Sequence, residues 1–416
     1  MVRLFRSIAL GKKNQLNVFT NHIYWVWGVL TVFMDRGKLS PSFIPRVLPH
    51  REAQINSFRD FFVDVLREPS RVFPLYVQAV GGVGTGKTCT AIRFAEQFVG
   101  EAGRSRLPLR YAYLNLKMLG GRVGVYRALV EKVTPEVFST SLGAEELLRG
   151  MVACLQSERR YLLIVVDEVD YYVKHYPKER IVYDLTRLSE FTPGKPCGVV
   201  GVIFISRDRR WAESLESSER STLGRCYVDF PPYASKQIYD ILEARVEEAF
   251  RPGAVPEEVL EYVADVTAEP PVYGDVRYAL DLLLYAGYLA DRQGCSRILP
   301  EHVRRVHGET WHGITEEDIL SLPRKGKIVL LALVRCLQAS KEPYASLRDV
   351  RDMTEVVCEE FRVRKFKDVE EHVQDLHDRG IIEIKSLTRI GISGVTAQDL
   401  GKYLDNILRR VGSGLK

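Results

Sequence analysis

The stretch Leu75–Thr88 reads LYVQAVGGVGTGKT, an apolar run that leads directly into a glycine-rich loop. Its second half matches the pattern G-x-x-x-x-G-K-[ST] in full, and the residues after it have helical apolar spacing. A strand, such a loop and a helix together point successive backbone N–H groups at phosphate oxygens. Lys87 is expected to reach the β- and γ-phosphates, and the Thr88 hydroxyl to ligate Mg²⁺. The stretch predicts a site for ATP or ADP with Mg²⁺, formed by Gly81, Gly82, Val83, Gly84, Thr85, Gly86, Lys87, Thr88 and Cys89.

A second apolar run, Tyr161–Asp167 (YLLIVVD), is followed by Glu168. An apolar strand that ends in two acidic residues places carboxylates at the carboxyl edge of a sheet, beside the expected metal. Asp167 is expected to hold Mg²⁺, mainly through its water shell, and Glu168 to orient and deprotonate an attacking water. The alternative is an acidic, solvated turn. Together with the phosphate loop upstream, the acidic pair predicts a nucleoside triphosphatase.

The rest of the first half alternates apolar runs with helical stretches, which is typical of a mainly parallel sheet with covered faces. The further strands are expected at Tyr111–Leu116, Val199–Ser206 and Tyr227–Phe230. From Ser235 to about Thr310 the apolar spacing is helical throughout and predicts a small helical bundle. We therefore expect an α/β module followed by an α-helical one.

The last part of the chain has the element order of a winged helix, a variant of the helix-turn-helix. Three helices are expected, at Lys325–Leu337, after Ser346 and at Lys367–Arg379. Two short strands, Ile381–Lys385 and Ile390–Val395, and a closing helix capped by Thr396 follow them.

The composition is typical of a globular protein and indicates the cellular compartment. It has 416 residues, 59 Lys+Arg against 54 Asp+Glu, and a formal net charge of +5. Seven scattered cysteines form no C-x-x-C pair, which predicts neither a zinc ribbon nor a disulfide framework and favours a reducing cytosol. The apolar run His22–Met34 is shorter than the roughly 20 residues of a bilayer span. We expect no membrane partner, and we treat residues 1–33 as an extension that need not belong to the core fold.

Several further motifs occur in the order found in one protein family. They are the segments FIPRVLPHRE (43–52), FPPY (230–233), ILEAR (241–245) and GDVRYAL (274–280), together with the phosphate loop and VVDEVD (165–170). In this combination the chain resembles the archaeal origin-recognition and helicase-loader initiators, a clade of AAA+ ATPases. The resemblance implies an α/β fold with an AAA+ P-loop parallel-sheet module at 34–233, a helical lid at 234–320 and a C-terminal winged-helix DNA-binding domain at 321–416.

The same resemblance implies roles for residues outside the phosphate loop. His50 and Arg51 would lie near the adenine, and Tyr233 and Arg245 would contact the nucleotide from the start of the lid. Arg277 would be sensor 2, a lid guanidinium that reports on the γ-phosphate. The implied catalytic set is Lys87, Asp167, Glu168 and Arg277.

One position departs from the family pattern. Where the family usually has a polar sensor 1 residue, commonly Asn, this sequence has Arg207 in the context Ile205-Ser206-Arg207-Asp208. An arginine cannot accept a hydrogen bond from the attacking water. We therefore expect hydrolysis to be slow or altered.

Candidate DNA contacts lie in the winged helix and in one further element. The Lys367–Arg379 helix occupies the position of a recognition helix, but its exposed residues include many acids. A winged helix that contacts protein, or a merely solvated charged face, is therefore an open alternative. The cations expected to contact DNA are Arg362, Arg364, Lys365 and Lys367 at the helix entry, Lys385 and Arg389 at the hairpin tip, and Arg122 in an extra helical element of the family.

The function implied is that of a slowly hydrolysing ATPase that binds double-stranded DNA at a replication origin and helps recruit or load the replicative helicase. Paralogous initiators would be partners, and the protein would be a cytoplasmic, nucleoid-associated monomer that assembles on DNA. Two alternatives remain open: a nucleotide-gated DNA-binding regulator without a loading role, and a ring-forming AAA+ DNA motor.

Overall fold

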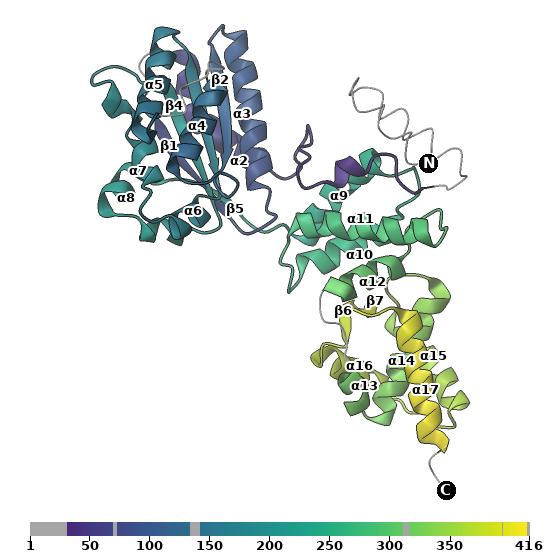
Figure 1. Ribbon diagram of the computed structural model, residues 1–416. Helices are drawn as coiled ribbons and strands as arrows, with labels where there is room; N and C mark the ends of the chain where they lie inside the picture. The colour runs from purple at the N-terminus through teal and green to yellow at the C-terminus, as the bar shows by residue number, and fades with distance from the viewer. Residues whose placement is uncertain (1–30, 70–72, 134–141, 311–315, 393, 414–416) are drawn as a thin grey trace, which may run out of the picture. The chain divides into compact units, whose positions relative to one another are not determined.

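The computed structural model describes residues 31–69, 73–133, 142–310, 316–392 and 394–413. The chain divides into two compact units, which are coloured by residue number in Figure 1. One unit comprises Pro41–Ile241 and Val266–Tyr278. The other comprises Leu242–Asp265 and Ala279–Lys416, together with the segment that ends at Ser40.

The first unit contains a parallel sheet whose strand order is β2-β3-β4-β1-β5. The prediction of a parallel sheet is confirmed, and all eight residues of the central strand β4 are buried, as expected for a strand covered on both faces. The register pairs Val80 with Ser206 and Asn115 with Asp167, so the carboxyl ends of neighbouring strands lie at one edge. The strands are β1 (Leu75–Gly81), β2 (Leu109–Asn115), β3 (Tyr161–Asp167), β4 (Val199–Ser206) and β5 (Cys226–Phe230).

Helices cover both faces of this sheet (Figure 1). On one face α2 (Glu52–Arg67) and α3 (Lys87–Arg104) pack through a row of stacked phenylalanine rings, with the Phe58 and Phe94 centroids 5.3 Å apart. The other face buries a separate apolar cluster under five helices and two 3₁₀ turns. These are α4 (Arg122–Val133), α5 (Ala144–Ser157), α6 (Val169–His175), α7 (Ile181–Thr186), η3 (Leu188–Phe191), η4 (Arg209–Ser214) and α8 (Ser217–Leu223).

The helical lid predicted from apolar spacing consists of four helices. They are α9 (Ser235–Ala249), α10 (Glu257–Ala268), α11 (Val276–Arg292) and α12 (Pro300–Thr310). In the part of the chain that the structure describes, no helix has the length and apolar character needed to cross a bilayer.

The C-terminal part has the predicted winged-helix element order. It contains α13 (Glu316–Ser321), α14 (Arg324–Ser340), α15 (Leu347–Glu360), α16 (Val369–Asp378), β6 (Ile382–Ser386), β7 (Arg389–Ile392) and α17 (Ala397–Ser413). Two predicted caps are present, since the hydroxyls of Ser346 and Thr396 each accept a hydrogen bond of 3.1 Å from the backbone N–H three residues later.

Two predicted boundaries in the winged helix are corrected. The third helix begins at Val369 rather than Lys367, so Lys367 lies in the preceding loop. The hairpin turn is short, because β6 ends at Ser386 and β7 begins at Arg389. Arg389 is therefore a strand residue and not part of the hairpin tip.

Side chains of the lid and of the winged helix are joined within the second unit. Arg304 of α12, only 1% exposed, donates a hydrogen bond of 2.7 Å to the carbonyl of Pro343. The Tyr344 hydroxyl donates to Asp265 Oδ2 of α10 at 2.9 Å, and Arg389 Nη2 lies 3.0 Å from the same oxygen. These contacts, one buried and two partly buried, tie the two modules, which the sequence predicts as separate domains, to one another.

The segment Thr31–Ser40, which contains η1 (Arg36–Leu39), packs on the lid helices. The ring of Phe33 stacks on Phe250 with centroids 4.8 Å apart, and the Val32 N–H donates to Asp291 Oδ1 at 2.7 Å. Gly287 makes room for this contact, because a Cβ atom there would lie 2.3 Å from the Phe33 ring. The last residues of the predicted extension 1–33 therefore belong to the folded unit, whereas residues 1–30 lie outside the described chain.

We expect Phe33→Ala to lower the free energy of unfolding of the lid-containing unit by about 3 kcal/mol, because Phe33 is 4% exposed and the substitution leaves a cavity beside Phe250. Urea unfolding followed by circular dichroism measures this change. The neighbouring substitution Met34→Ala, at a side chain that is 52% exposed, is the control and should change stability by less than about 0.5 kcal/mol. Equal losses for the two variants would contradict a structural role for the segment.

Candidate nucleotide site

The phosphate loop connects β1 to α3 in a conformation that its glycines permit. Gly84 and Gly86 have φ angles of 66° and 83°, in the left-handed region that other residues rarely adopt. Lys87 is the first residue of α3, and its Nζ donates hydrogen bonds to the carbonyls of Gly81 and Gly82 at 2.7 and 2.6 Å. Burial lowers the pKa of this ammonium to about 8. The amino end of the helix and a folded-back lysine leave a cradle that suits a phosphate chain.

The end of β3 lies directly beside the loop. Asp167, 6% exposed, accepts a hydrogen bond from the Thr88 hydroxyl at 2.7 Å and one from the Tyr113 hydroxyl at 2.9 Å. Burial raises the pKa of the Tyr113 phenol, and the neighbouring Asp167 carboxylate raises it further. The Tyr113 hydroxyl therefore stays protonated and donates its hydrogen bond.

The Thr88 hydroxyl and the Asp167 carboxylate fit a magnesium ion. Both are hard oxygen donors, and they lie within contact of each other at the mouth of the phosphate loop. Within the described residues, no three His, Cys, Asp or Glu side chains form a metal cluster. A magnesium ion here would therefore take its remaining ligands from phosphate and water, which is the arrangement this ion prefers.

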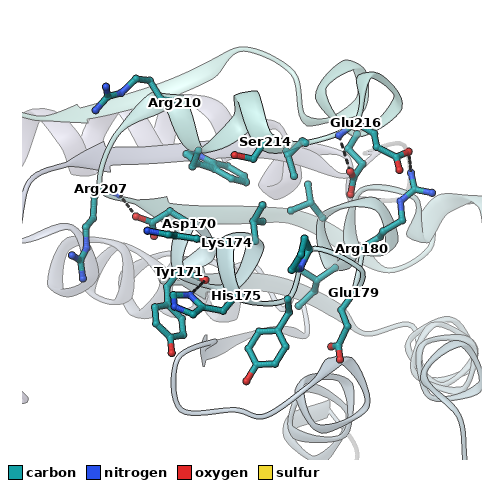
Figure 2. A pocket seen from close by; sticks show the side chains of 18 of the residues that line it. Asp170, Tyr171, Lys174, His175, Glu179, Arg180, Arg207, Arg210, Ser214 and Glu216 are labelled. Atoms are coloured by element: carbon teal, nitrogen blue, oxygen red, sulfur yellow. Dashed lines mark hydrogen bonds and ion pairs between the residues drawn. The ribbon is translucent and has the colours of Figure 1, made fainter.

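Glu168 is the second acidic residue at this edge. Its backbone has a φ angle of 58°, a conformation that non-glycine residues adopt mainly at turns and functional sites. Its Oε2 atom lies 3.5 Å from a guanidinium nitrogen of Arg207. The Arg207 backbone N–H donates to Asp170 Oδ2 at 3.2 Å, which Figure 2 shows as a dashed line. Arg207, in the position expected for sensor 1, is thus paired with the expected catalytic base.

The lid contributes Arg277 to the same place. The Asp275 carboxylate caps α11 by accepting the Arg277 backbone N–H at 2.9 Å, and it packs on Gly84, where a Cβ atom would lie only 1.7 Å from Asp275 Oδ1. This contact brings the first turn of α11 onto the phosphate loop. One small cleft is consequently lined by Lys87, Thr88, Asp167, Glu168, Arg207 and Arg277 together with neighbouring loop residues.

Arg51 and Tyr233 brace the phosphate loop from behind. Arg51 is 2% exposed, and its Nε and Nη2 atoms donate to the carbonyl of Thr85 at 3.0 and 2.8 Å. Its guanidinium carbon lies 3.7 Å from the centroid of the Tyr233 ring, whose hydroxyl reaches Gly86. Burial raises the pKa of Tyr233 to about 12. The structure therefore gives both side chains contacts that shape the loop.

The remaining predicted nucleotide residues have different surroundings. His50 Nε2 lies 2.7 Å from Asp240 Oδ2 at the start of the lid. Cys89 is partly exposed in the first turn of α3. Arg245 is buried on α9, in the compact unit that does not contain the phosphate loop.

Sequence reasoning did not identify Tyr113, Asp170 or Asp275 as parts of the site. Tyr113 reaches Asp167 because β2 and β3 are neighbours in the sheet. The sequence of either strand alone does not predict which strands are neighbours. Asp170 and Asp275 each hold a backbone N–H of an arginine that lines the cleft. For Asp275 a signal exists, since an aspartate directly before a helix is a common cap.

The predicted DNA-contact cations of the winged helix fall into two groups. Arg362, Arg364, Lys365 and Lys367 are all exposed in the loop between α15 and α16. Lys365 is paired there with Glu355 and Glu359, each at 2.8 Å. In the described chain, Arg362, Arg364 and Lys367 have no acidic side chain within ion-pair distance, so their charges are the ones available to a polyanion.

The other predicted DNA contacts are half-buried and less accessible. Arg389 pairs with Asp265 and with Glu261, at 3.0 and 3.1 Å, and Lys385 is half-buried on β6. In the first unit, Arg122 Nε lies 2.6 Å from Asp184 Oδ2. These three residues stay predictions as DNA contacts, although two of them are held by carboxylates in this structure.

Comparison with known proteins gives three family matches that follow the order of the modules. Residues 77–210 match the AAA domain, 239–308 the Cdc6 AAA+ ATPase-type lid domain, and 317–394 the CDC6 C-terminal winged-helix domain. The three ranges correspond to the parallel sheet, the four lid helices and the winged helix described above.

Similar proteins come from several archaea. The chain is 30% identical over 370 residues to an ORC1-type DNA replication protein of Desulfurococcus amylolyticus, covering 88% of this chain and 90% of that protein. It is 31% identical over 367 residues to one of Pyrococcus furiosus, covering 86% and 84%.

Two solved structures are also similar. Cdc6p from Pyrobaculum aerophilum superposes with a TM-score of 0.77 at 27% identity, covering 91% of this chain and 99% of that one. The Aeropyrum pernix ORC1 protein, solved in complex with DNA, gives a TM-score of 0.58 at 27% identity over 91% and 98%. The order of the matched modules and the extent of these similarities show that the chain belongs to the ORC1/Cdc6 family of AAA+ DNA replication proteins.

Proposed function

We propose that this protein is a replication initiator that binds and slowly hydrolyses ATP, binds double-stranded DNA at an origin, and helps recruit or load the replicative helicase. One observation carries the ATPase part of the proposal. A single cleft is lined by the phosphate-loop lysine, the acidic end of β3 and the lid arginine Arg277. Those are the groups needed to hold a triphosphate, place a metal, activate water and respond to the γ-phosphate.

The residues would divide the work as follows. The loop N–H groups and Lys87 hold the phosphates, and Thr88 and Asp167 hold Mg²⁺, which would neutralise charge on the phosphate oxygens. Glu168 accepts the proton of the attacking water while the water oxygen bonds to the γ-phosphorus and the bond to the bridging oxygen of ADP breaks. Arg277 stabilises the charge on the γ-phosphate from the first turn of α11.

The DNA part of the proposal rests on the winged helix and on the Aeropyrum pernix relative solved with DNA. In this chain the exposed cations at the entry to α16 would contact phosphates, and the acidic helix behind them would contribute little base readout. We further propose the domain boundaries 34–233, 234–320 and 321–416, nucleoid association in the cytoplasm, and a monomer that assembles on origin DNA with paralogous initiators.

A second candidate function is a nucleotide-gated DNA-binding regulator without a loading role. The pairing of Arg207 with Glu168 favours it, because a restrained base suits a long-lived bound state. Genome-wide footprinting with ATP and with ADP separates the two functions. Occupancy confined to promoters, with none at the replication origin, would replace the initiator proposal with this one. A stable hexamer with vigorous DNA-stimulated turnover would instead indicate a ring-forming motor.

We expect Lys87→Ala to weaken ATP binding at least about tenfold, because a charge-assisted contact to the phosphates is lost. Glu168→Gln should retain ATP binding and lower kcat by about 100-fold or more, because the base that accepts the proton is removed. Fluorescent-nucleotide titration and phosphate-release assays measure the two effects. Turnover by E168Q equal to that of the wild type would disprove the role of Glu168 and the hydrolytic part of the proposal.

The double substitution Arg364→Ala with Lys367→Ala should weaken binding to duplex DNA and reduce the slope of log K against log salt by about two. Fluorescence anisotropy at several salt concentrations measures the slope. Lys365→Ala should have a smaller effect, because Glu355 and Glu359 already neutralise its charge. Lys402→Ala, at an exposed position of α17, is the control for loss of a positive charge alone. An unchanged slope in the double variant would show that another surface contacts the DNA.

A further inference from the structure

Arg207 and Glu168 occupy the same cleft and carry opposite charges. Glu168 Oε2 is buried and accepts no hydrogen bond from the described residues, and a guanidinium nitrogen of Arg207 lies 3.5 Å away from it. The Glu168 side chain is 23% exposed, whereas that of Arg207 is 55% exposed. The arginine thus provides the compensating charge for a carboxylate oxygen that would otherwise be buried without a partner.

The position of Arg207 is fixed at its backbone. The Arg207 N–H donates to Asp170 Oδ2, so the end of β4 is held to the start of α6 (Figure 2). Glu168 directly precedes α6 in a left-handed backbone conformation that aims its side chain toward this point. The backbone of Arg207 is thus held beside α6, and its side chain, at 55% exposed, is the more accessible partner of the ion pair.

The ion pair opposes the chemistry proposed for Glu168. During hydrolysis the oxygen of water bonds to the γ-phosphorus, the bond to the bridging oxygen of ADP breaks, and a proton of the water passes to the Glu168 carboxylate. A carboxylate that is paired with a guanidinium is a weaker hydrogen-bond acceptor for that water, and its Oε2 atom is turned toward Arg207.

We propose that Arg207 is a positioning residue that restrains Glu168 and limits the rate of ATP hydrolysis by this protein. The inference rests on the proposed ATPase function and adds a specific cause for its slow turnover. Hydrolysis then proceeds only in the fraction of bound complexes in which the Arg207–Glu168 pair is broken.

Arg207→Asn and Arg207→Ala test this proposal in the full-length protein. Both variants should raise kcat roughly two- to fivefold, the range that a half-exposed ion pair permits. The dissociation constant for ATP, measured by fluorescent-nucleotide titration, should change by less than about twofold. Arg207→Lys should return kcat toward the wild-type value, because it restores the positive charge. The control is Arg210→Ala, whose side chain is 79% exposed and pairs with Asp208; its kcat should equal that of the wild type.

A second measurement uses no nucleotide. The melting temperatures of R207A, E168Q and the double variant form a double-mutant cycle, and their shifts should be non-additive because the two side chains interact. Additive shifts would overturn the proposed pairing. A fall in kcat for R207N and R207A would overturn the proposed restraint and indicate that Arg207 stabilises the transition state. An unchanged kcat would also overturn the proposed restraint. A different result would disprove the ATPase proposal itself: E168Q and the wild type would then turn over ATP at the same rate.

Discussion

Parallel pairing of β3, β4 and β1 is the constraint on which the rest of the site depends. Parallel strands end at a common edge, so the phosphate loop after β1, the acidic pair after β3 and Arg207 after β4 must lie together. Of these strands, β1 and β4 are neighbours in the sheet although more than a hundred residues separate them in the sequence. The hydrophobic faces that fix the strand order therefore also fix the chemistry at the edge.

The first turn of α11, which belongs to the same compact unit as the phosphate loop, reaches that edge through two close approaches. Gly84 accommodates Asp275, and Gly274, with a φ angle of 80°, passes so near Tyr233 that a Cβ atom would lie 2.7 Å from its carbonyl oxygen. A larger residue at either glycine would push the first turn of α11 away from the phosphate loop. The position of Arg277 in the cleft therefore depends on these two glycines as well as on its own side chain.

Much of this arrangement could be predicted from the sequence. The bounds of β3 and β4 follow directly from continuous apolar runs, and Ser346 and Thr396 identify two helix starts through local hydrogen bonding. Local patterns of this kind require only neighbours in the chain.

Other features depend on partners that are distant in the sequence. The ion pairs of Arg389 require α10 to lie beside β7. The position of Arg389 in the strand follows from a hairpin turn two residues shorter than the sequence pattern suggests. The packing of Phe33 depends on the missing side chain of Gly287, more than 250 residues away. Neither contact produces a periodic pattern in the sequence from which it could be predicted. Each is made by one or two side chains against a surface that only the tertiary structure forms.

The contacts between lid and winged helix change how the predicted DNA surface is understood. Arg304 is buried against the Pro343 carbonyl, and Asp265 holds both Tyr344 and Arg389. Removing one partner of this partly buried network destabilises it, because the other partner is left without compensation. Separation of the two modules would break several such contacts together, whereas the loop that carries Arg362, Arg364 and Lys367 takes no part in them. The cations that hold the winged helix to the lid are therefore different residues from Arg362, Arg364 and Lys367, the cations proposed to contact DNA.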